Sequence, residues 1–264
     1  MNTATAIQTL FAEDHISCSS LGLFQRCPRK YRFRYIDQLP VETRASALAF
    51  GSAVHEALAG FYVALKAGEP ELSADQLATV FRDAWRRELR SDTPILFGDN
   101  ESADSLIDLG VRMLSVFHET AERPHRVVEV EMPFSIEIAE GLPLLVGVLD
   151  LVVQDKDELY GVIEHKTGAK RWTDEKLNYD GQLTAYRMAA PYLGLGDAPV
   201  TIQLLTKTKQ PDLVIYNPTR TQADIDEFVE TASAVLRAVE AGAFWCSRSW
   251  QCNGCEYAAR CVAG

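Results

Sequence analysis

The stretch GVLDLVVQDKDELYGVIEHKTG (residues 147–168) decides the fold of this chain. It contains two apolar runs that are typical of buried strands, and a polar turn separates them. Asp150 lies inside the first run and Glu164 inside the second. A carboxylate among Val, Leu and Ile costs desolvation free energy unless a cation lies beside it. We therefore expect a hairpin whose two carboxylates share a cationic partner.

The numbering of the residues tests the register of this hairpin. Opposed residues of an antiparallel hairpin have numbers with a constant sum, and pairing Asp150 with Glu164 leaves the loop Lys156-Asp157-Glu158. Three residues are an accepted hairpin length, whereas a two-residue loop would put the carboxylates on opposite faces. Lys166 lies two residues beyond Glu164 and shares its face. Two carboxylates and one ammonium group are thus predicted to converge.

Two carboxylates in this arrangement suit Mg²⁺ or Mn²⁺, which usually keep waters and a substrate phosphate as their remaining ligands. Lys166 could orient or activate an attacking water and offset the charge that develops on a phosphate. The alternative is a cross-strand ion pair on a solvated face, and the apolar neighbours of both carboxylates weigh against it. Glu131, on the preceding strand, could also line the site.

The rest of the chain divides into a mostly helical part (17–122), a sheet core (127–216) and a final helix with a cysteine cluster (221–264). The patterns predict helices at 17–38, 45–66, 73–90, about 103–122, 176–193 and 221–241, and strands at 127–138, 144–153, 158–165, 200–206 and 212–216. This order predicts one α/β domain over residues 1–264, with a mixed central sheet flanked by helices.

Composition narrows the function classes. The 264 residues are 47% hydrophobic, and 37 acidic against 26 basic residues give a net charge of −11, which argues against bulk electrostatic binding to DNA. We see no apolar run of roughly 18 residues and expect no membrane partner. The opening MNTATAIQTLFAEDH lacks the basic and apolar regions of a secretory signal, so we expect a cytoplasmic protein.

Two local patterns depart from this ordinary composition. Between Arg26 and Arg34 five of nine residues are basic, none is acidic, and aromatic residues interleave with them. A solvated helix face would also explain that charge run. The segment CNGCEYAARC (252–261) has the spacing C-x2-C-x5-C, which without a secretory signal points to a metal rather than to disulfides. Three thiolates need a fourth ligand, which could be Cys246 or a distant cysteine, and four thiolates suit zinc or an iron–sulfur cluster.

Taken together, these residues resemble the PD-(D/E)XK nucleases, whose core is a G-x-x-D strand followed by E-x-K. Three further motifs narrow the resemblance to the RecB-like branch: His55 in GSAVHEALAGF, Gln182 and Tyr186 in GQLTAYRMA, and the Cys-Pro segment LGLFQRCPRKYRFRYID. The match runs from about residue 17 to 261, and its specificity lies in the order and spacing of the motifs. The resemblance implies a restriction-endonuclease-like core with a helical N-terminal elaboration and a cysteine-rich final segment.

The resemblance also implies roles for individual residues. His55, Asp150 and Glu164 would hold the divalent metal together with the backbone carbonyl of His165, and Lys166 would be the catalytic lysine. Gln182 and Tyr186 would support the site or contact DNA. RecB-like nucleases with an iron–sulfur cluster, which include the AddB nuclease domain and CRISPR-associated nucleases, place its ligands at positions that correspond here to Cys27, Cys252, Cys255 and Cys261. Cys246 is the main rival of Cys27 as the fourth ligand, and zinc is the alternative to a 4Fe–4S cluster.

The implied function is metal-dependent hydrolysis of DNA phosphodiesters, by an exonuclease that acts on single strands or DNA ends. The basic-aromatic segment would then track a DNA backbone and stack bases through Arg26, Arg29, Lys30, Tyr31, Arg32 and Arg34. A helicase, recombination or CRISPR partner would be a separate chain. The alternatives are a non-catalytic DNA-binding or processing subunit of a larger complex, and a structural protein held together by zinc.

Overall fold

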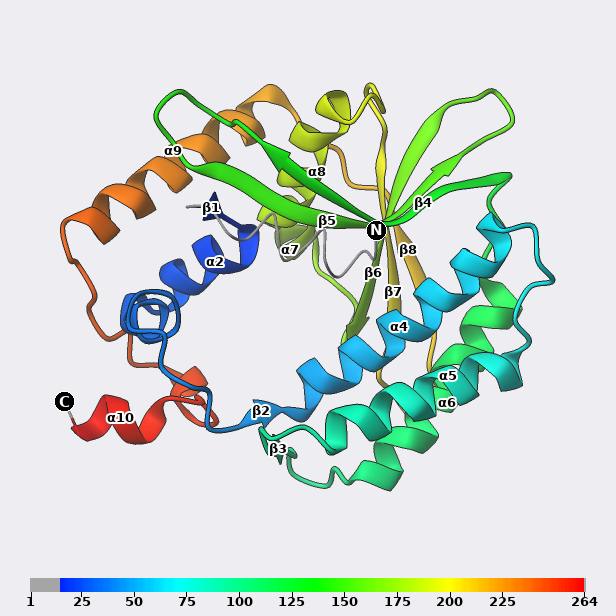
Figure 1. Cartoon of the computed structure of the whole chain (residues 1–264), viewed down its shortest axis with the longest axis horizontal. Helices are drawn as coiled ribbons and strands as arrows, with labels where there is room; N and C mark the ends of the chain where they lie inside the picture. Colours follow the sequence, from blue (N-terminus) through cyan, green and yellow to red (C-terminus); the bar gives the residue numbers. More distant parts are fainter. Residues whose placement is uncertain (1–14, 264) are drawn as a thin grey trace.

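The computed structural model describes residues 15–263 of the chain. Residues 1–14, on which the expectation of no secretory signal rests, lie outside the described residues, as does residue 264. A central sheet runs through the molecule with helices packed on both of its faces (Figure 1). This arrangement confirms the predicted α/β fold.

The central sheet of the described residues is mixed. Its strands are β1 (His15–Ile16), β4 (Arg126–Ile136), β5 (Leu144–Gln154), β6 (Tyr160–Gly168), β7 (Val200–Thr206) and β8 (Leu213–Tyr216). The pairs β4–β5, β5–β6 and β7–β8 are antiparallel, whereas β6 and β7 run parallel, and so do β1 and the start of β5. The parallel pair is possible because a helical segment crosses over between β6 and β7.

The hairpin of β5 and β6 has the predicted register. Leu151 pairs with Ile163 and Gln154 with Tyr160, so the paired residue numbers have the predicted constant sum. The Asp155 backbone N–H donates to the Leu159 carbonyl at 3.0 Å, which closes the expected loop at 156–158. Glu158 adopts the left-handed conformation with φ of 63°, as the last loop residue of a three-residue hairpin commonly does.

β5 and β6 separate immediately beyond this ladder. The final pair of the β5–β6 ladder, Leu151 with Ile163, lies one residue away from Asp150 and Glu164. On the same edge of β5, further toward its start, Leu145 pairs with Ile16 of β1. β6 therefore leaves its neighbour at the two carboxylates, and the sheet opens there.

β5 also changes the face that it presents at Asp150. Leu149 and Leu151 would share a face in a regular strand, yet Leu149 belongs to one hydrophobic core and Leu151 to the other. On the neighbouring strand the change coincides with Glu131, whose φ is 52°, a left-handed value that is uncommon for a residue with a side chain. At Asp150 and Glu131, therefore, the two strands depart from the regular alternation of side chains between the two faces of the sheet.

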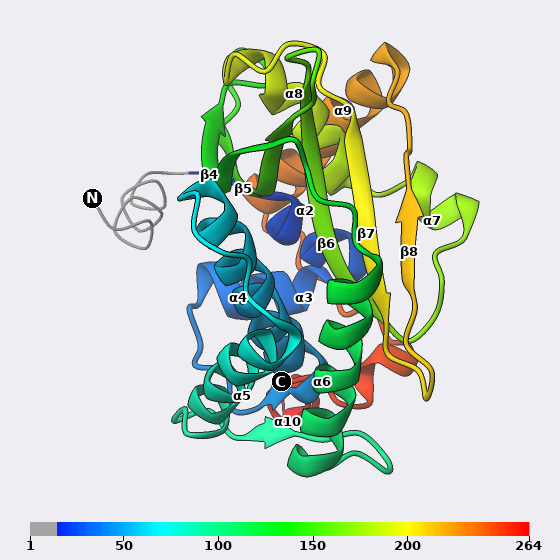
Figure 2. The same ribbon diagram turned by 90° about the vertical axis from the view of Figure 1, so that its right-hand side faces the viewer.

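Two helical layers cover the sheet, and Figure 2 shows them from the side. One layer contains α4 (Ser46–Lys66), α5 (Ala74–Leu89) and α6 (Ala103–Thr120). The other contains α2 (Cys18–Arg26), α7 (Asp174–Asn178), α8 (Gly181–Tyr192) and α9 (Gln222–Glu240). Each layer has its own hydrophobic core against the sheet, so the site at the opening of β5 and β6 lies between two packed layers.

The structure corrects three sequence-based boundaries. The predicted helix 17–38 breaks at Cys27, where Pro28 begins α3 (Pro28–Tyr31), and a π-helical turn, η1 (Arg32–Ile36), follows. Proline restricts the residue before it to extended conformations, so Cys27 cannot continue α2. The predicted helix 176–193 divides into α7 and α8, because Asp180 caps a new helix. Between the predicted helices 73–90 and 103–122, where no strand is predicted, the structure contains β3 (Ile95–Leu96), which pairs in parallel with β2 (Arg44–Ala45).

α4 corrects the expectation that no segment is long and apolar enough to span a membrane. Among the described residues it is the one helix that passes this test by length and composition. Half of its most apolar window is buried, and residues such as Val54 and Phe61 pack inside the core with α5 and α6. Core packing thus accounts for its hydrophobicity.

The cysteine-rich segment (residues 246–261) packs against the start of the chain. It contains η2 (Trp250–Cys252) and most of α10 (Ala258–Ala263). The Tyr257 hydroxyl donates to the Leu39 carbonyl at 3.1 Å, and Lys30 forms an ion pair with Glu256 at 2.6 Å. Segments more than 200 positions apart therefore form one unit beside α3 and η1.

Candidate active site

Asp150 and Glu164 meet where β5 and β6 separate. An Asp150 carboxylate oxygen, Oδ2, accepts a hydrogen bond of 2.9 Å from the backbone N–H of His165. Glu164 is only 1% exposed, and its side chain receives the Lys166 ammonium on Oε1. The predicted convergence of two carboxylates and one lysine is thus present in the structure.

α8 contributes a network of hydrogen bonds to this site. The Gln182 side chain accepts from Lys166 Nζ at 2.6 Å and donates to the Tyr186 hydroxyl at 2.6 Å. That hydroxyl lies 2.7 Å from Glu164 Oε2 and 2.6 Å from the Val148 carbonyl. Residues four apart share a helix face, so the Q-x-x-x-Y spacing delivers both side chains to Glu164 and Lys166.

Two histidines lie on the α4 side of the sheet. His55 Nδ1, on α4, is 3.5 Å from Asp150 Oδ2. Burial lowers the pKa of His55 and lowers that of His165 to about 3, so both imidazoles are neutral at pH 7. The contact of His55 with Asp150 is therefore not an ion pair, and a neutral imidazole is the form that binds metals.

The pKa values of Asp150 and Lys166 are both raised, for different reasons. Burial and the neighbouring Glu164 raise the pKa of Asp150 well above its usual range. Burial pulls the pKa of Lys166 down, but Glu164 and Asp150 raise it by more, so the net shift is upward. Lys166 therefore stays protonated at neutral pH and supplies positive charge rather than a base. One lysine does not fully neutralise the buried Glu164 and the partly buried Asp150, which favours a further cation.

Glu131 lies across from Asp150 on the neighbouring strand, between the pairs of Val130 and Met132. It lines a small cavity that also touches His55, Asp150 and the His165 ring. Sequence reasoning placed Glu131 near the site, as the structure does, but it missed the His165 side chain. Both ring nitrogens of His165 are buried without a hydrogen-bond partner among the described residues.

The donor types around Asp150 are those that Mg²⁺ and Mn²⁺ accept. Within residues 15–263, no three His, Cys, Asp or Glu side chains are already arranged as a complete metal site. In particular, Glu164 points toward Lys166 and Tyr186. The residues fit a divalent metal by chemistry and by proximity, and a bound ion would replace part of this internal pairing.

The basic-aromatic segment is more internally paired than its sequence suggests. Lys30 and Arg34 both form ion pairs with Glu256, and Arg32 pairs with Asp37. Arg26 and Arg29 form no ion pair among the described residues. The aromatic rings of the segment pack against other rings: Phe33 contacts Tyr257, and Tyr31 contacts Phe24 and Tyr35. Much of this segment therefore holds the cysteine-rich segment in place.

Three of the predicted cluster cysteines gather with Cys246. Cys27 lies in the break between α2 and α3, and Cys246 Sγ is 3.5 Å from Cys261 Sγ. Cys261 raises the pKa of the Cys246 thiol, and Cys27 adds to that effect. Burial raises the pKa of Cys255, with a smaller contribution from Cys27. The rival ligand Cys246 thus belongs to the same neighbourhood.

The two remaining cysteines, Cys252 and Cys18, have different surroundings. Cys252 is exposed and its sulfur accepts a hydrogen bond from the Ser249 backbone N–H at 3.5 Å. Cys18 lies beside the carboxylate site, where its thiol donates to the Gly181 carbonyl and burial raises its pKa to about 12. Its surroundings are not purely apolar, since Asp180 and Lys166 are among its electrostatic neighbours.

A mixed sheet whose central hairpin carries an Asp on one strand and Glu-x-Lys on the next defines a class of phosphodiester-cleaving nucleases. The family model described as the PD-(D/E)XK nuclease superfamily matches residues 15–262. The chain therefore belongs to the PD-(D/E)XK nuclease superfamily.

One solved structure supports the fold. A protein from Eubacterium rectale, whose name assigns it provisionally as an exonuclease, superposes with a TM-score of 0.58 at 14% identity, over 98% of this chain and 92% of that one. The structure of SSO0001 aligns over 99% of this chain and 92% of its own at 14% identity, with a TM-score of 0.40. No curated protein matches the chain.

Proposed function

We propose that this chain is a metal-dependent DNA exonuclease that acts on single strands or DNA ends and carries a structural 4Fe–4S cluster. The observation that supports the activity is the buried Glu164, held by Lys166 and Tyr186 beside Asp150, at the point where two strands separate. A carboxylate pair of this kind costs folding free energy, so a cation-dependent role explains its presence better than an ion pair does.

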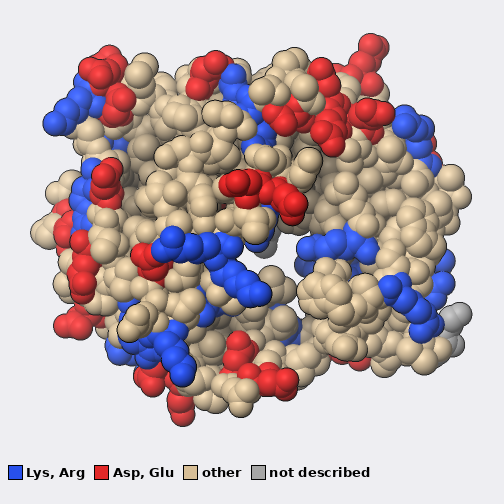
Figure 3. All heavy atoms as spheres, turned by 180° about the vertical axis from the view of Figure 1, so that it is seen from behind, with Lys and Arg blue, Asp and Glu red and all other residues tan. Residues whose placement is uncertain are grey.

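The shape of the molecule supports a strand as substrate. The space-filling view shows an opening through the middle of the molecule, with Lys and Arg side chains on two sides of it and acidic side chains above (Figure 3). In the ribbon view α2 and the cysteine-rich segment lie on one side of this opening and α4 on the other (Figure 1). Local positive charge of this kind can guide a DNA backbone although the whole chain carries a net charge of −11.

The proposed mechanism assigns each residue a task. His55, Asp150, Glu164 and the backbone carbonyl of His165 would hold Mg²⁺ or Mn²⁺. When bound, the ion would activate a water and offset charge on the scissile phosphate. Lys166, protonated and anchored by Gln182, would stabilise the negative charge that develops during hydrolysis.

Replacing Lys166 by Ala tests the proposed activity. Purified protein is incubated with end-labelled single-stranded DNA and Mn²⁺ or Mg²⁺, and the products are resolved as a ladder. We expect wild type to cut in a metal-dependent manner and Lys166→Ala to lose about a hundredfold or more in rate. Lys156→Ala, at the exposed tip of the same hairpin, serves as the matched control and should cut like wild type. A folded wild type that cuts nothing would instead favour a DNA-binding subunit.

Iron content tests the proposed cluster. Protein purified without oxygen should be brown and contain about four iron atoms per chain, whereas a zinc protein is colourless. Cys27→Ser should lose the iron, and Cys18→Ser, which alters a cysteine beside the carboxylate site, should retain it. Retention of all iron by Cys27→Ser together with its loss in Cys246→Ser would assign the fourth ligand to Cys246 instead.

A further inference from the structure

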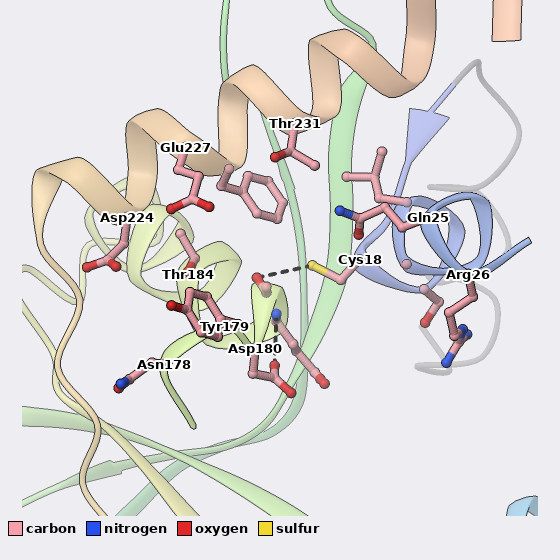
Figure 4. Close-up of a pocket in the computed structure, with 16 residues that line it drawn as sticks. Cys18, Gln25, Arg26, Asn178, Tyr179, Asp180, Thr184, Asp224, Glu227 and Thr231 are labelled. Carbon is pink, nitrogen blue, oxygen red and sulfur yellow. Dashed lines mark hydrogen bonds between the residues drawn. The ribbon is translucent and has the colours of Figure 1, made fainter. Parts of the chain in front are cut away.

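A cavity of about 680 Å³ opens beside the carboxylate site, between α2, α9 and the connection of α7 to α8 (Figure 4). Its volume falls in the range of small-molecule sites. Gln182 belongs to both, because it lines the cavity and its side chain accepts from Lys166 Nζ at 2.6 Å. On the floor of the cavity, the Cys18 thiol joins α2 to the start of α8 through the Gly181 carbonyl, 3.5 Å away. The cavity therefore adjoins the candidate active site, and Gln182 lies between the two.

The charge of this cavity is opposite to that expected for a phosphate site. Asp180, Asp224 and Glu227 line it, and Arg26 is the one cation among the lining residues. Arg220, outside the lining, donates to the Thr184 hydroxyl and is an electrostatic neighbour of Asp224, so three carboxylates face two guanidinium groups. Hydrogen bonds from Thr221 lower the pKa of Asp224, which is therefore ionised at neutral pH. Glu227 forms no ion pair among the described residues, and Figure 4 shows its carboxylate directed from α9 toward the cavity. A phosphate dianion would meet like charges here, which is unfavourable.

The uncharged lining suits a nucleoside. Tyr179 is 79% exposed at the cavity, where its ring is free of contacts with other rings in the described part of the chain. An exposed ring beside a nuclease site offers a stacking surface for a base. Asn178 and Gln25 add amide groups, and the carboxylates can accept from base N–H groups or from sugar hydroxyls.

We propose that this cavity holds the terminal nucleoside of the strand, and that its carboxylates select an end with a free hydroxyl over an end with a phosphate. The inference rests on the proposed exonuclease function and adds its end specificity. With the scissile phosphate at Asp150 and Glu164, the nucleoside beyond it would reach past Gln182 into the cavity. A terminal phosphate would then lie among Asp180, Asp224 and Glu227.

The test compares oligonucleotides that differ only in their ends. Internally labelled single strands carry a hydroxyl or a phosphate at the 3′ or at the 5′ end, and kcat/KM is measured for each with Mn²⁺. At the end that is degraded we expect a preference for hydroxyl of about tenfold. Glu227→Gln should reduce that preference about threefold, and Glu230→Gln, the same change one turn along α9 outside the cavity, should leave it unchanged.

A second pair of variants tests the stacking surface. Tyr179→Ala should raise KM about tenfold with little change in kcat, whereas Tyr192→Ala, which removes a similarly exposed tyrosine at the end of α8, should change neither. Equal cleavage of hydroxyl and phosphate ends, unaffected by Glu227→Gln, would overturn the inference and leave the exonuclease function intact.

A binding measurement distinguishes failure of the proposed nucleoside subsite from failure of the proposed hydrolysis. With Ca²⁺ in place of Mn²⁺, fluorescence anisotropy reports binding of the same oligonucleotides without requiring cleavage. Tighter binding of hydroxyl ends, reduced by Glu227→Gln, would support the subsite even if no substrate is cut, in which case the proposed hydrolysis alone would fail. Equal binding of both kinds of end would overturn the subsite.

Discussion

Asp150→Asn is expected to hydrolyse DNA about a thousandfold more slowly than wild type and, without metal, to unfold at a higher temperature. The loss of rate follows because the amide removes a negative ligand from the proposed metal site. The gain in stability follows from burial and Glu164, which raise the pKa of Asp150 in the folded protein. The ionised carboxylate is therefore penalised in the folded state and not in the unfolded state.

The sign of this effect depends on pH. Below the unfolded pKa the carboxyl is protonated in both states and the penalty is absent; the penalty grows as pH rises from the unfolded pKa to the raised folded pKa and is complete above it. At pH 7 we expect Asp150→Asn to gain about 1 kcal/mol or more. An Asn side-chain oxygen can still accept the hydrogen bond from the His165 N–H, so the variant keeps that contact.

Thermal unfolding in EDTA and in Mn²⁺ measures both halves of this prediction. In EDTA the variant should have the higher Tm, and in Mn²⁺ only wild type should gain stability, because only it binds the ion well. Asp157→Asn, at the exposed hairpin tip, is the matched control and should match wild type in both buffers. A lower Tm of Asp150→Asn in EDTA would mean that the ionised carboxylate stabilises the fold, contrary to our reading of the site.

Gly110→Ala is expected to destabilise the protein by roughly 2–3 kcal/mol, although alanine normally favours a helix. Gly110 lies in α6, and a methyl group there would overlap the ring of Phe81. Phe81 is fully buried in α5 and contacts the Phe50 ring at 5.6 Å, so it has no room to move. Phe50 lies in α4, so the contact involves all three helices of the layer that carries His55. Loosening of this layer should also weaken metal binding.

Gly60→Ala is the matched control, because the same substitution should have the opposite sign. Gly60 lies in α4, and its added methyl group would have only ordinary contact with Leu72, at 3.9 Å. We expect a gain of up to about 1 kcal/mol from helix propensity. Urea unfolding of both variants and wild type measures the difference. A Gly110→Ala variant as stable as Gly60→Ala would show that α5 and α6 separate more easily than their packing indicates.

The sequence predicted the parts of this molecule that depend on local spacing. The hairpin register followed from residue parity and a permitted loop length, so the meeting of Asp150, Glu164 and Lys166 could be derived before the structure. The spacing of Gln182 and Tyr186 likewise gave their common helix face. Only the family resemblance placed this pair at the site, because the contacts of Tyr186 with Glu164 and of Gln182 with Lys166 join a strand to the helix that follows it.

The features that escaped prediction depend on distant parts of the chain. Glu256 forms ion pairs with Lys30 and Arg34, and no local sequence pattern connects residues so far apart. Glu131 adopts a left-handed backbone that its residue type does not favour, so only the neighbouring strand explains it. The cavity of about 680 Å³ beside the carboxylate site was also missed, since Cys18 of α2 and residues of α8 and α9 line it together.

The packing of the cysteine-rich segment against η1 has a consequence for synthesis on the ribosome. Tyr257 bonds to the carbonyl of Leu39, and 218 positions separate them. At about 5–20 residues per second, Leu39 waits roughly 10–40 s for its partner to be made. The last strand of the sheet, β8, ends at Tyr216, so for the following 41 positions, about 2–8 s of synthesis, the sheet and its carboxylates can fold while the wall beside the opening is incomplete. The carboxylate site of the nascent chain can therefore form before the cysteine-rich segment that packs beside η1.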